Sequence, residues 1–396
     1  MIVNVFFQTF TIIKTAVRLS SCFLFTFTIY FSSVVKERKI CYDKRIEILM
    51  QPALRERLPK GTVFVMTKDK VLALLKNQTD YLSGAWISEK IGVSRMAVSS
   101  AVKALREEGY DIASSTNRGY LLKNAPDLLN TGEIMGYLPE GFSGPILCLN
   151  SVDSTNRYLK SLALNGAENY TVVLANEQTN GKGRVGRAFS SPKGKGIYLS
   201  LLLYPQNLPG GFLQLSDSPA LTACTALAVR NAISSVCSTD IQIKWLNDLM
   251  ADGRKLSGIL TEMSMESESD HVEYVIIGIG INVNQMLSDF DDSLKEKAVS
   301  LRMLTGTKQS RAKLTAALLQ EMTAMLSHFP DKLPSYLEAY RAANLTPGRK
   351  VTLNGPEGIR SGIAEEIEND FSLRVRLDNG EILKVRGGDL KQEGLY

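Results

Sequence analysis

Gly181-Lys-Gly-Arg-Val-Gly-Arg187, followed by Ser190-Ser-Pro-Lys-Gly-Lys-Gly196 and the apolar run Ile197–Tyr204, decides the fold of the central part of this chain. The first stretch has the GxGxxG spacing of a dinucleotide-binding turn, but such a turn must open a helix whose N-terminus holds the pyrophosphate. Here the second stretch leads straight into a strand, and the Gly-Lys-Ser/Thr of a P-loop is missing. The sequence therefore excludes both folds and predicts a pliable basic loop, suited to a phosphate-bearing ligand.

Apolar runs typical of strands and helices alternate on both sides of this loop. They begin at Ile146 and continue as Thr171–Ala175, Ile197–Tyr204, the helical run Ala220–Ser235, Ile241–Trp245, Lys255–Met263 and Tyr274–Val283. Alternation of this kind predicts an α+β or α/β domain.

Two of these strands carry polar residues or glycines on one face. In Ile241-Gln-Ile-Lys-Trp245 the side chain of Lys244 must point away from its apolar neighbours, because successive strand residues face opposite sides. In the last strand, the same alternation places four residues on one face: Gly278, Gly280, Asn282 and Asn284. The strand before it contributes Gly258. Such glycines indicate that something approaches the backbone closely. A packed helix is one explanation, but the asparagines favour a polar ligand.

Residues 67–125 have the pattern of three helices and a hairpin. Ser83 and Ser94 are suited to cap the second and third helices, and Gly92 to end the second. Two short strand-like runs then follow on either side of a polar loop, Ala113–Arg118. This order predicts a winged helix-turn-helix domain.

The third helix of this domain buries Val98, Val102 and Leu105, which leaves its other face to solvent. The side chains expected to contact DNA are Arg95, Ser99, Ser100 and Lys103 in a major groove and Arg118 on the wing. Packing against a protein partner is the alternative. The helix order and the wing favour DNA, and the domain is basic enough to attract phosphates.

The composition bounds the class of protein. A chain of 396 residues has room for two or three domains, and its 22% charged residues and net charge of +5 are typical of a soluble protein. The five cysteines form no CxxC pair, and the two histidines lie away from the motifs. These facts predict a cytoplasmic protein with no metal site of its own, no disulfide framework and no histidine-centred triad.

Residues 1–66 differ from the rest of the chain. Seven of the 14 phenylalanines lie in Met1–Phe31, and no acidic residue precedes Glu37. Leu19–Phe31, the apolar part of the longest uncharged segment, is shorter than the roughly 20 residues of a membrane-spanning helix. No small-residue cleavage site of a signal peptide follows this segment. We interpret residues 1–66 as an atypical apolar extension, either real or included upstream of a natural start at Met66.

Residues 344–396 form a third unit. Short strand-like runs are Lys350–Leu353, Ile359–Ile367, Phe371–Leu377 and Glu381–Val385, and Asn379-Gly380 marks a tight hairpin. Strands this short and this closely spaced predict a small β-barrel.

Six motifs, taken together and in order, resemble those of the biotin–protein ligases: Asp153-Ser-Thr-Asn156, Glu177–Arg187, Ser191–Gly196, Lys244-Trp-Leu-Asn-Asp248, Lys255–Leu260 and Gly278–Asn284. With the winged domain in front, residues 67–396 resemble the family of bifunctional biotin operon repressors and biotin–[acetyl-CoA-carboxylase] ligases. The resemblance implies an α+β chain. Its parts would be an N-terminal winged helix-turn-helix domain (67–125), a class II synthetase-like α/β ligase domain (130–343) and an SH3-like C-terminal β-barrel (344–396).

The resemblance also implies the activity. The family joins biotin to ATP, with Mg²⁺, to give biotinyl-5′-adenylate and pyrophosphate. It then transfers biotin to a lysine of the biotin carboxyl carrier protein of acetyl-CoA carboxylase. A biotin-dependent repressor of biotin genes would bind operator DNA as a homodimer when it holds the adenylate. No membrane is implied for residues 67–396.

Site residues follow from the matching motifs. Lys244 and Arg184 would act at the reacting carboxylate and α-phosphate. Biotin would be bound by Ser154, Thr155, Asn156, Gln178, Lys182, Gly183, Arg184, Lys244 and Gly258. ATP and the adenylate would be bound by Arg184, Arg187, Asn247, Asn282 and Asn284, beneath a lid formed by Gln285–Ser300.

Elementary electrostatics agrees with these roles. A carboxylate is ionised at neutral pH and needs no base, but a triphosphate repels it, so the reaction needs positive charge. Three positions depart from the commonest family pattern: Lys182 stands where arginine is frequent, Leu246 where proline is usual and Phe189 where tryptophan is common. None of the three removes a charge that the reaction needs.

Two other functions remain open from the sequence. A lipoate-type ligase would share the core fold and the adenylate chemistry, although the winged domain and the Lys-Trp-x-Asn-Asp turn disfavour it. A non-catalytic, biotin-sensing DNA-binding regulator is the alternative from another class.

Overall fold

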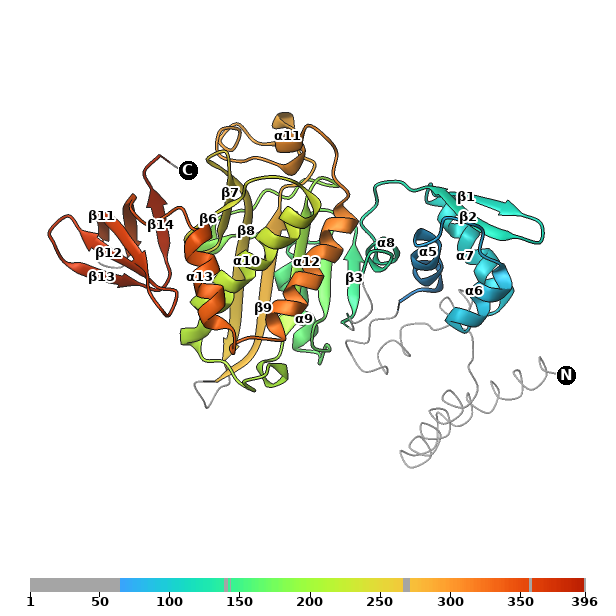
Figure 1. The fold of residues 1–396 in the computed structure, drawn as a ribbon, viewed down its shortest axis with the longest axis horizontal. Helices are drawn as coiled ribbons and strands as arrows, with labels where there is room; N and C mark the ends of the chain where they lie inside the picture. Colours follow the sequence, from blue (N-terminus) through green and yellow to red (C-terminus); the bar gives the residue numbers. More distant parts are fainter. Residues whose placement is uncertain (1–64, 139–141, 143, 266–270, 356–357, 395–396) are drawn as a thin grey trace, which may run out of the picture.

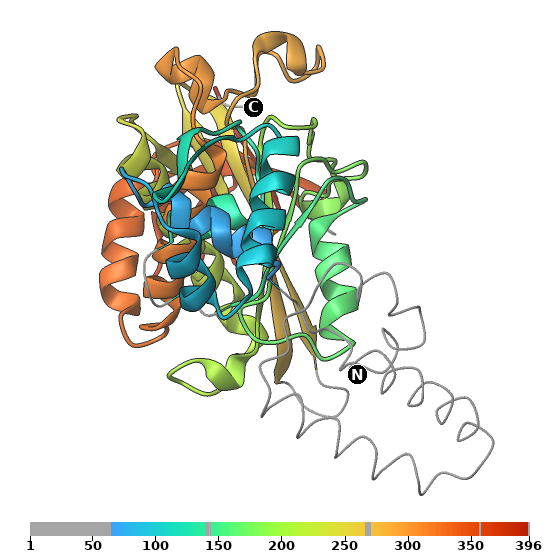
Figure 2. The same ribbon diagram turned by 90° about the vertical axis from the view of Figure 1, so that its right-hand side faces the viewer.

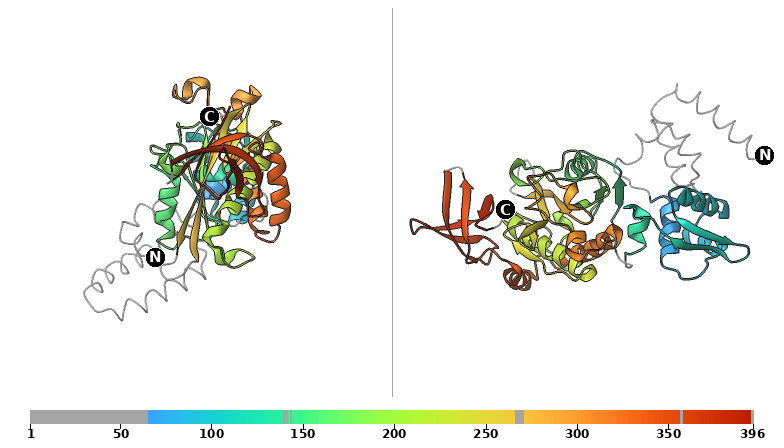
Figure 3. Two further views of the ribbon diagram at one scale, coloured as in Figure 1. Left: turned by 90° about the vertical axis from the view of Figure 1, so that its left-hand side faces the viewer. Right: turned by 90° about the horizontal axis from the view of Figure 1, so that it is seen from above.

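The computed structural model of the chain describes residues 65–138, 142, 144–265, 271–355 and 358–394. Three parts follow one another along the long axis, with the N-terminal helices and hairpin at one end and a small sheet at the other (Figure 1, Figure 3). Nearly all of the unusual segment 1–66 lies outside the described residues. Within the described residues, none of the helices is both long and apolar enough to span a bilayer.

The N-terminal part is a helix-turn-helix with a wing. Its elements are α5 (Thr67–Lys76), α6 (Gly84–Ile91), α7 (Arg95–Glu107), β1 (Asp111–Ser115) and β2 (Gly119–Asn124). The predicted caps are confirmed, because the side chains of Ser83 and Ser94 accept from Trp86 N and Ala97 N. Gly92 ends α6 with a left-handed φ of 71°. The antiparallel pair β1–β2 is the predicted wing.

A short helix, α8 (Thr131–Met135), joins this part to the central domain. Lys76 on α5 and Glu133 on α8 form an ion pair at 2.5 Å, with side chains only 9% and 5% exposed. A Cβ at Gly132 would lie 2.8 Å from the Cα of Asp69, so the two helices touch backbone to backbone. The winged part is therefore packed on the central domain through α8, which lies between α5 and β3 (Figure 1). Figure 2 views the molecule from this winged end.

The central domain is built on a seven-stranded sheet of order β3-β4-β5-β9-β8-β7-β6, in which β3–β4 is parallel and the other pairs are antiparallel. Its strands are β3 (Ile146–Leu149), β4 (Val172–Ala175), β5 (Ile197–Leu203), β6 (Gln242–Lys244), β7 (Asp248–Ala251), β8 (Arg254–Met265) and β9 (Val272–Ile281). Strand β7 was not predicted.

Helices cover both faces of this sheet (Figure 1). On one face lie α10 (Ser218–Val236), α12 (Arg311–Leu326) and α13 (Leu333–Ala343), and on the other lies α9 (Thr155–Ala163). Alternation along β5 sends Leu199, Leu201 and Leu203 to the larger core and Leu202 to the α9 side. Ser200 therefore shares the α9 side, where it contacts the first residues of that helix.

The C-terminal part is an antiparallel five-stranded sheet of order β13-β12-β11-β10-β14. Its strands are β10 (Lys350–Gly355), β11 (Gly358–Ile367), β12 (Leu373–Leu377), β13 (Ile382–Val385) and β14 (Asp389–Gln392), the last not predicted. The predicted hairpin at Asn379-Gly380 is confirmed, with Gly380 at a φ of 88°. Trp245 Nε1 donates to Phe371 O at 2.9 Å, and this sheet shares its core with the central domain.

Candidate active site

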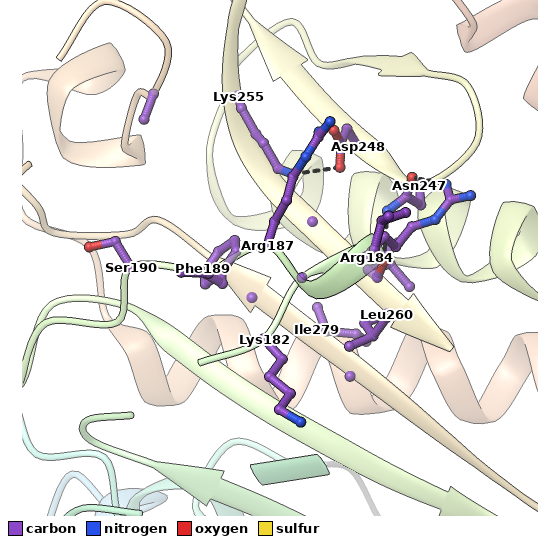
Figure 4. Close-up of a pocket in the computed structure, with 18 of the residues that line it drawn as sticks. Lys182, Arg184, Arg187, Phe189, Ser190, Asn247, Asp248, Lys255, Leu260 and Ile279 are labelled. Atoms are coloured by element: carbon purple, nitrogen blue, oxygen red, sulfur yellow. Dashed lines mark hydrogen bonds and ion pairs between the residues drawn. The ribbon is translucent and has the colours of Figure 1, made fainter. Parts of the chain in front are cut away.

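A cavity of about 600 Å³ opens on the α9 side of the central sheet. Its walls come from the start of α9, the basic loop that contains the turn η1 (Arg184–Gly186), the 244–248 turn and the ends of β8 and β9. The segment after β9 and residues 388–391 of the C-terminal sheet complete it. Figure 4 shows the basic loop crossing in front of the strands, with its side chains spread around the cavity.

The residues predicted to bind biotin or nucleotide gather here, although they are spread over some 130 positions of the sequence. The cavity is lined by Ser154, Thr155, Asn156, Gln178, Lys182, Gly183, Arg184, Arg187, Lys244, Asn247, Gly258 and Asn282.

Asn284 is the exception among the predicted residues. It does not line the cavity, because its amide group is paired with the backbone of Gln309, donating to the O and accepting from the N at 2.9 Å each. The predicted alternation failed because β9 ends at Ile281, so the pleat does not continue to residue 284. Asn284 instead fixes the base of the segment that follows.

The surroundings of the β9 glycines also differ from the expectation that a ligand approaches the backbone there. A Cβ at Gly278 would lie 2.3 Å from Asn156 Oδ1, and one at Gly280 would lie 2.5 Å from the ring of Phe189. The close approach that these glycines permit is therefore made by the chain's own side chains. The glycines let a polar amide and an aromatic ring lie flat on the sheet and form the floor of the cavity.

Positive charge dominates one part of the cavity. Seven lining side chains are cationic, namely Lys182, Arg184, Arg187, Lys244, Lys255, Lys297 and Lys391, against the single carboxylate of Asp248. Lys255 Nζ lies 2.7 Å from that carboxylate. Figure 4 shows Arg187 extending toward this pair and Lys182 extending the opposite way. An excess of this size suits a polyanionic ligand such as a triphosphate.

Lys244 is the most enclosed of these cations. It ends β6, its side chain is only 5% exposed, and its neighbours Ile243 and Trp245 are in the core on the other side, as predicted. In the turn that follows, Asn247 Nδ2 donates to Ile259 O at 2.7 Å. A charge placed in such surroundings acts on a ligand more strongly than one in water.

Arg184 joins the basic loop to two other parts of the site. Its Nη1 donates to Asn247 Oδ1 at 2.6 Å, and its Nη2 donates to Gly388 O at 3.0 Å. The loop thus contacts both the 244–248 turn and the C-terminal sheet, and Arg184 is pre-positioned within the cavity.

The other end of the cavity is neutral and rich in amides and hydroxyls. Gln178 Oε1 accepts from both the N and the Oγ1 of Thr155 at 2.9 and 3.0 Å, and its Nε2 donates to Ser191 Oγ at 3.0 Å. These groups are buried or half-buried, so a ligand there must match their hydrogen-bonding pattern.

Residues 285–300, the segment predicted to act as a lid, contribute Phe290, Leu294, Lys297 and Ala298 to the lining of the cavity. The short turn η4 (Leu287–Asp289) of this segment is tied down by Lys195, whose Nζ lies 3.0 Å from Asp289 Oδ2. Burial alone would raise the pKa of Asp289, but the hydrogen bond from Met286 N and the Lys195 ammonium outweigh it, so the pKa lies below its ordinary value. The tie is therefore fully charged at neutral pH.

Several lining residues were not predicted as site residues. Lys255 lies within a quoted motif, so its position could have been noticed, whereas Lys297 follows no motif. Leu390 and Lys391 come from the unpredicted strand β14. No local pattern could place them, because they reach the cavity only through the packing of the C-terminal sheet on the central domain.

The residues predicted to contact DNA lie far from this cavity, on the winged part. Arg95, Ser99, Ser100 and Lys103 are all exposed on α7, as the sequence predicted. Arg118 on the wing is exposed too, but it pairs with Asp80 Oδ1 at 2.7 Å and lies 4.5 Å from the centre of the Tyr81 ring. It is therefore held against its own domain in this structure.

Comparison with known proteins matches both regions. Residues 148–282 match the biotin/lipoate A/B protein ligase family, and residues 67–121 match a helix-turn-helix domain. The bifunctional ligase/repressor BirA of Bacillus spizizenii is 36% identical over 331 residues, covering 82% of this chain and 98% of that protein. BirA of Escherichia coli is 28% identical, covering 81% and 95%.

A solved structure agrees with these matches. The biotin protein ligase of Aquifex aeolicus, in complex with biotin and ATP, superposes with a TM-score of 0.54 at 28% identity, covering 64% of this chain and all of that one. The similarity thus extends from the winged part through the cavity, and the chain belongs to the biotin–protein ligases, within the bifunctional ligase/repressor family.

Proposed function

We propose that the chain adenylates biotin with ATP and transfers it to a lysine of the biotin carboxyl carrier protein of acetyl-CoA carboxylase. One observation carries the proposal: a single cavity joins a neutral amide end to a cationic end that contains the buried Lys244. Biotin has a neutral ring system and a carboxylate tail, so it matches both ends at once.

The first step joins two anions. A biotin carboxylate oxygen attacks the α-phosphorus of ATP, forming the mixed anhydride while the bond to pyrophosphate breaks. Lys244 and Arg184 would stabilise the charge that spreads over the phosphate oxygens, and Arg187, Asn247 and Asn282 would hold the nucleotide under the lid. In the second step the carrier lysine, as a free amine, attacks the biotinyl carbonyl and AMP leaves with the anhydride oxygen.

The biotin ring would lie at the amide end. Ser154, Thr155, Asn156 and Gln178 supply hydrogen-bonding groups there, and Lys182, Gly183 and Gly258 would enclose the rest of the molecule. The support for this placement is that the amide end is the one part of the lining without a cluster of cations.

Magnesium fits the cavity as a companion of ATP. Mg²⁺ usually takes one or two carboxylates together with substrate phosphates, and Asp248 is the one carboxylate in the lining. Asp248 would hold the ion, which neutralises phosphate charge when bound. Among the described residues no cluster of three His, Cys, Asp or Glu side chains could hold a metal without ATP.

The proposal has a direct test in pyrophosphate exchange. The chain is incubated with ATP, Mg²⁺ and radiolabelled pyrophosphate, and with either biotin or lipoate. Exchange that depends on biotin alone supports the proposal. Exchange with lipoate would indicate the lipoate-type ligase, and no exchange with either acid would indicate the non-catalytic regulator.

We also propose that the adenylate-bound chain represses biotin genes as a cytoplasmic homodimer on operator DNA. The adenylate would order the Lys182–Arg187 loop and thereby favour dimerisation, which pairs two α7 helices on a palindromic site. The exposed α7 face and the buried Lys76–Glu133 junction, which connects the winged part to the ligand-binding domain, support this proposal.

A further inference from the structure

Two side chains outside all the motifs hold Asn156 at the amide end of the cavity: the buried Ser200 and the exposed Glu262. Asn156 Nδ2 donates to Glu262 Oε2 on β8 at 2.6 Å, and Ser200 Oγ on β5 donates to Asn156 Oδ1 at 2.5 Å. Ser200 is fully buried, and it also lies 2.8 Å from Thr155 Oγ1. Asn156 is thus gripped at both atoms of its amide.

The chemistry of the partners fixes the direction of this grip. An ionised carboxylate only accepts hydrogen bonds, so Glu262 must face the amide nitrogen of Asn156 and never its oxygen. The oxygen is then left to the Ser200 hydroxyl, which can donate. An asparagine amide has two orientations that differ little in shape, and here Glu262 selects one of them.

This orientation decides what Asn156 offers to a ligand. A carbonyl oxygen can accept two hydrogen bonds, one at each lone pair. Among the described residues, Ser200 donates one of these bonds to Asn156 Oδ1. Gln178 is complementary, because Oε1 already accepts from Thr155 N while Nε2 uses one of its two hydrogens for Ser191. The amide end therefore presents an acceptor on Asn156 and a donor on Gln178.

We infer that Glu262 and Ser200 are positioning residues that set specificity for the ureido group of biotin by fixing the Asn156 amide as an acceptor. The inference rests on the proposed function. A ureido group has two N–H donors and one carbonyl acceptor, which match the acceptor and the donor of the site. A dithiolane ring, as in lipoate, has no N–H to donate and no carbonyl, so it would leave both amides unpaired.

Glu262→Gln is the sharpest test because it keeps the size of the side chain but adds N–H donors. The Asn156 amide can then turn over and present its own N–H groups to the ligand. We expect the KM for biotin in the pyrophosphate exchange assay to rise about tenfold or more. The KM for ATP and the kcat at saturating biotin should stay within about twofold of wild type, since neither Glu262 nor Asn156 reaches the reacting atoms.

Discrimination between biotin and close analogues distinguishes a positioning role of Glu262 from a merely structural one. Two carbamate analogues of biotin replace one ureido N–H or the other by oxygen at nearly constant shape. Wild type should discriminate against at least one of them by about tenfold, and Glu262→Gln should lose most of that discrimination. General loosening of the site would instead weaken biotin and both analogues alike.

Two further variants complete the experiment. Ser200→Ala removes the donor to Asn156 Oδ1 and should shift the same ratio, with thermal melting to confirm that it folds. Glu273→Gln on β9 is the matched control, because its exposed carboxylate accepts from Ser264 Oγ at 3.2 Å, away from the cavity. It should behave as wild type.

An unchanged biotin KM and unchanged discrimination in both Glu262→Gln and folded Ser200→Ala would overturn the inference, while wild-type exchange with biotin would leave the proposed function standing. Absence of biotin-dependent exchange in wild type would overturn the proposed function and this inference with it.

Discussion

The exposed face of α7 and the cavity of the central domain are built in opposite ways. The four α7 residues expected to meet DNA come from nine consecutive positions, 95–103, and lie on the surface of one helix. The cavity residues come from positions 154–391, and some, such as Arg184 and Asn156, are held by contacts with distant parts of the chain. The difference teaches that a surface made by one helix follows from local pattern, whereas a pocket depends on how sheets pack.

The comparison predicts different consequences of substitution. Residues on α7 should act nearly independently, because all four side chains are exposed. Residues in the cavity should act as a set, since Arg184, Asn247 and Gly388 hold one another.

Lys244→Ala should lower the rate of biotin-dependent pyrophosphate exchange by about 10²-fold or more, the scale expected when a pre-positioned charge stabiliser is removed. The loss should appear in kcat, because the charge acts mainly in the transition state. Lys160→Ala, an exposed lysine on α9, is the control and should be unaffected. Near-normal exchange in Lys244→Ala would refute the role given to this lysine.

Arg95→Ala should weaken binding to the cognate operator by about tenfold, the scale of one lost base contact. Exchange activity should be unchanged, because α7 lies far from the cavity. Electrophoretic mobility shift at physiological salt, with biotin and ATP present, measures the first effect and the exchange assay the second. Equal operator affinity in Arg95→Ala and wild type would show that α7 does not enter the groove at this residue.

Asp289→Asn should raise the KM for ATP by a few fold, since the half-exposed ion pair with Lys195 contributes on the order of 1 kcal/mol or less. Asp292→Asn, on the same lid but paired through a 96% exposed carboxylate, should have no effect. Because the pKa of Asp289 is lowered, the Lys195–Asp289 ion pair contributes fully above the ordinary pKa of an aspartate. This contribution is lost only as the pH falls through the lowered pKa of Asp289. The wild-type KM for ATP should therefore show no change from this group between about pH 6 and pH 8.

Arg118→Ala should have the smallest effect, about twofold to threefold on DNA binding. A phosphate contact acts alike on all sequences, so specific and non-specific affinities should fall together and the slope against log salt should decrease by about one. Because Arg118 is paired with Asp80 in the present structure, an unchanged salt slope would mean that this pairing persists on DNA.

The same difference between one exposed helix and a packed pocket explains how much of each region the sequence predicts. Ser83, Ser94 and Gly92 reveal the winged domain because caps act on their own helix, and the paired strands of the wing are equally local. In the cavity, strand alternation places Lys244 correctly. The same rule fails at Asn284, because it does not apply beyond the end of β9.

Other parts of the cavity could not be predicted at all. Gly278 and Gly280 suggest a close approach, but only the packed structure shows that Asn156 and Phe189 make it. Lys391 lines the cavity and Glu262 contacts Asn156 only because segments far apart in sequence pack together. Resemblance to a family identifies the motifs, whereas the groups that hold those motifs in place appear only once the chain is folded.

The central claim is that cations held in the cavity overcome the repulsion between a carboxylate and a triphosphate. A crystal structure of the chain with biotin and a non-hydrolysable ATP analogue tests it most directly. We expect Lys244 Nζ and a guanidinium nitrogen of Arg184 to lie within about 3 Å of oxygens of the carboxylate or the α-phosphate. Both side chains turned away from the bound molecules, with the ligands otherwise ordered, would contradict it.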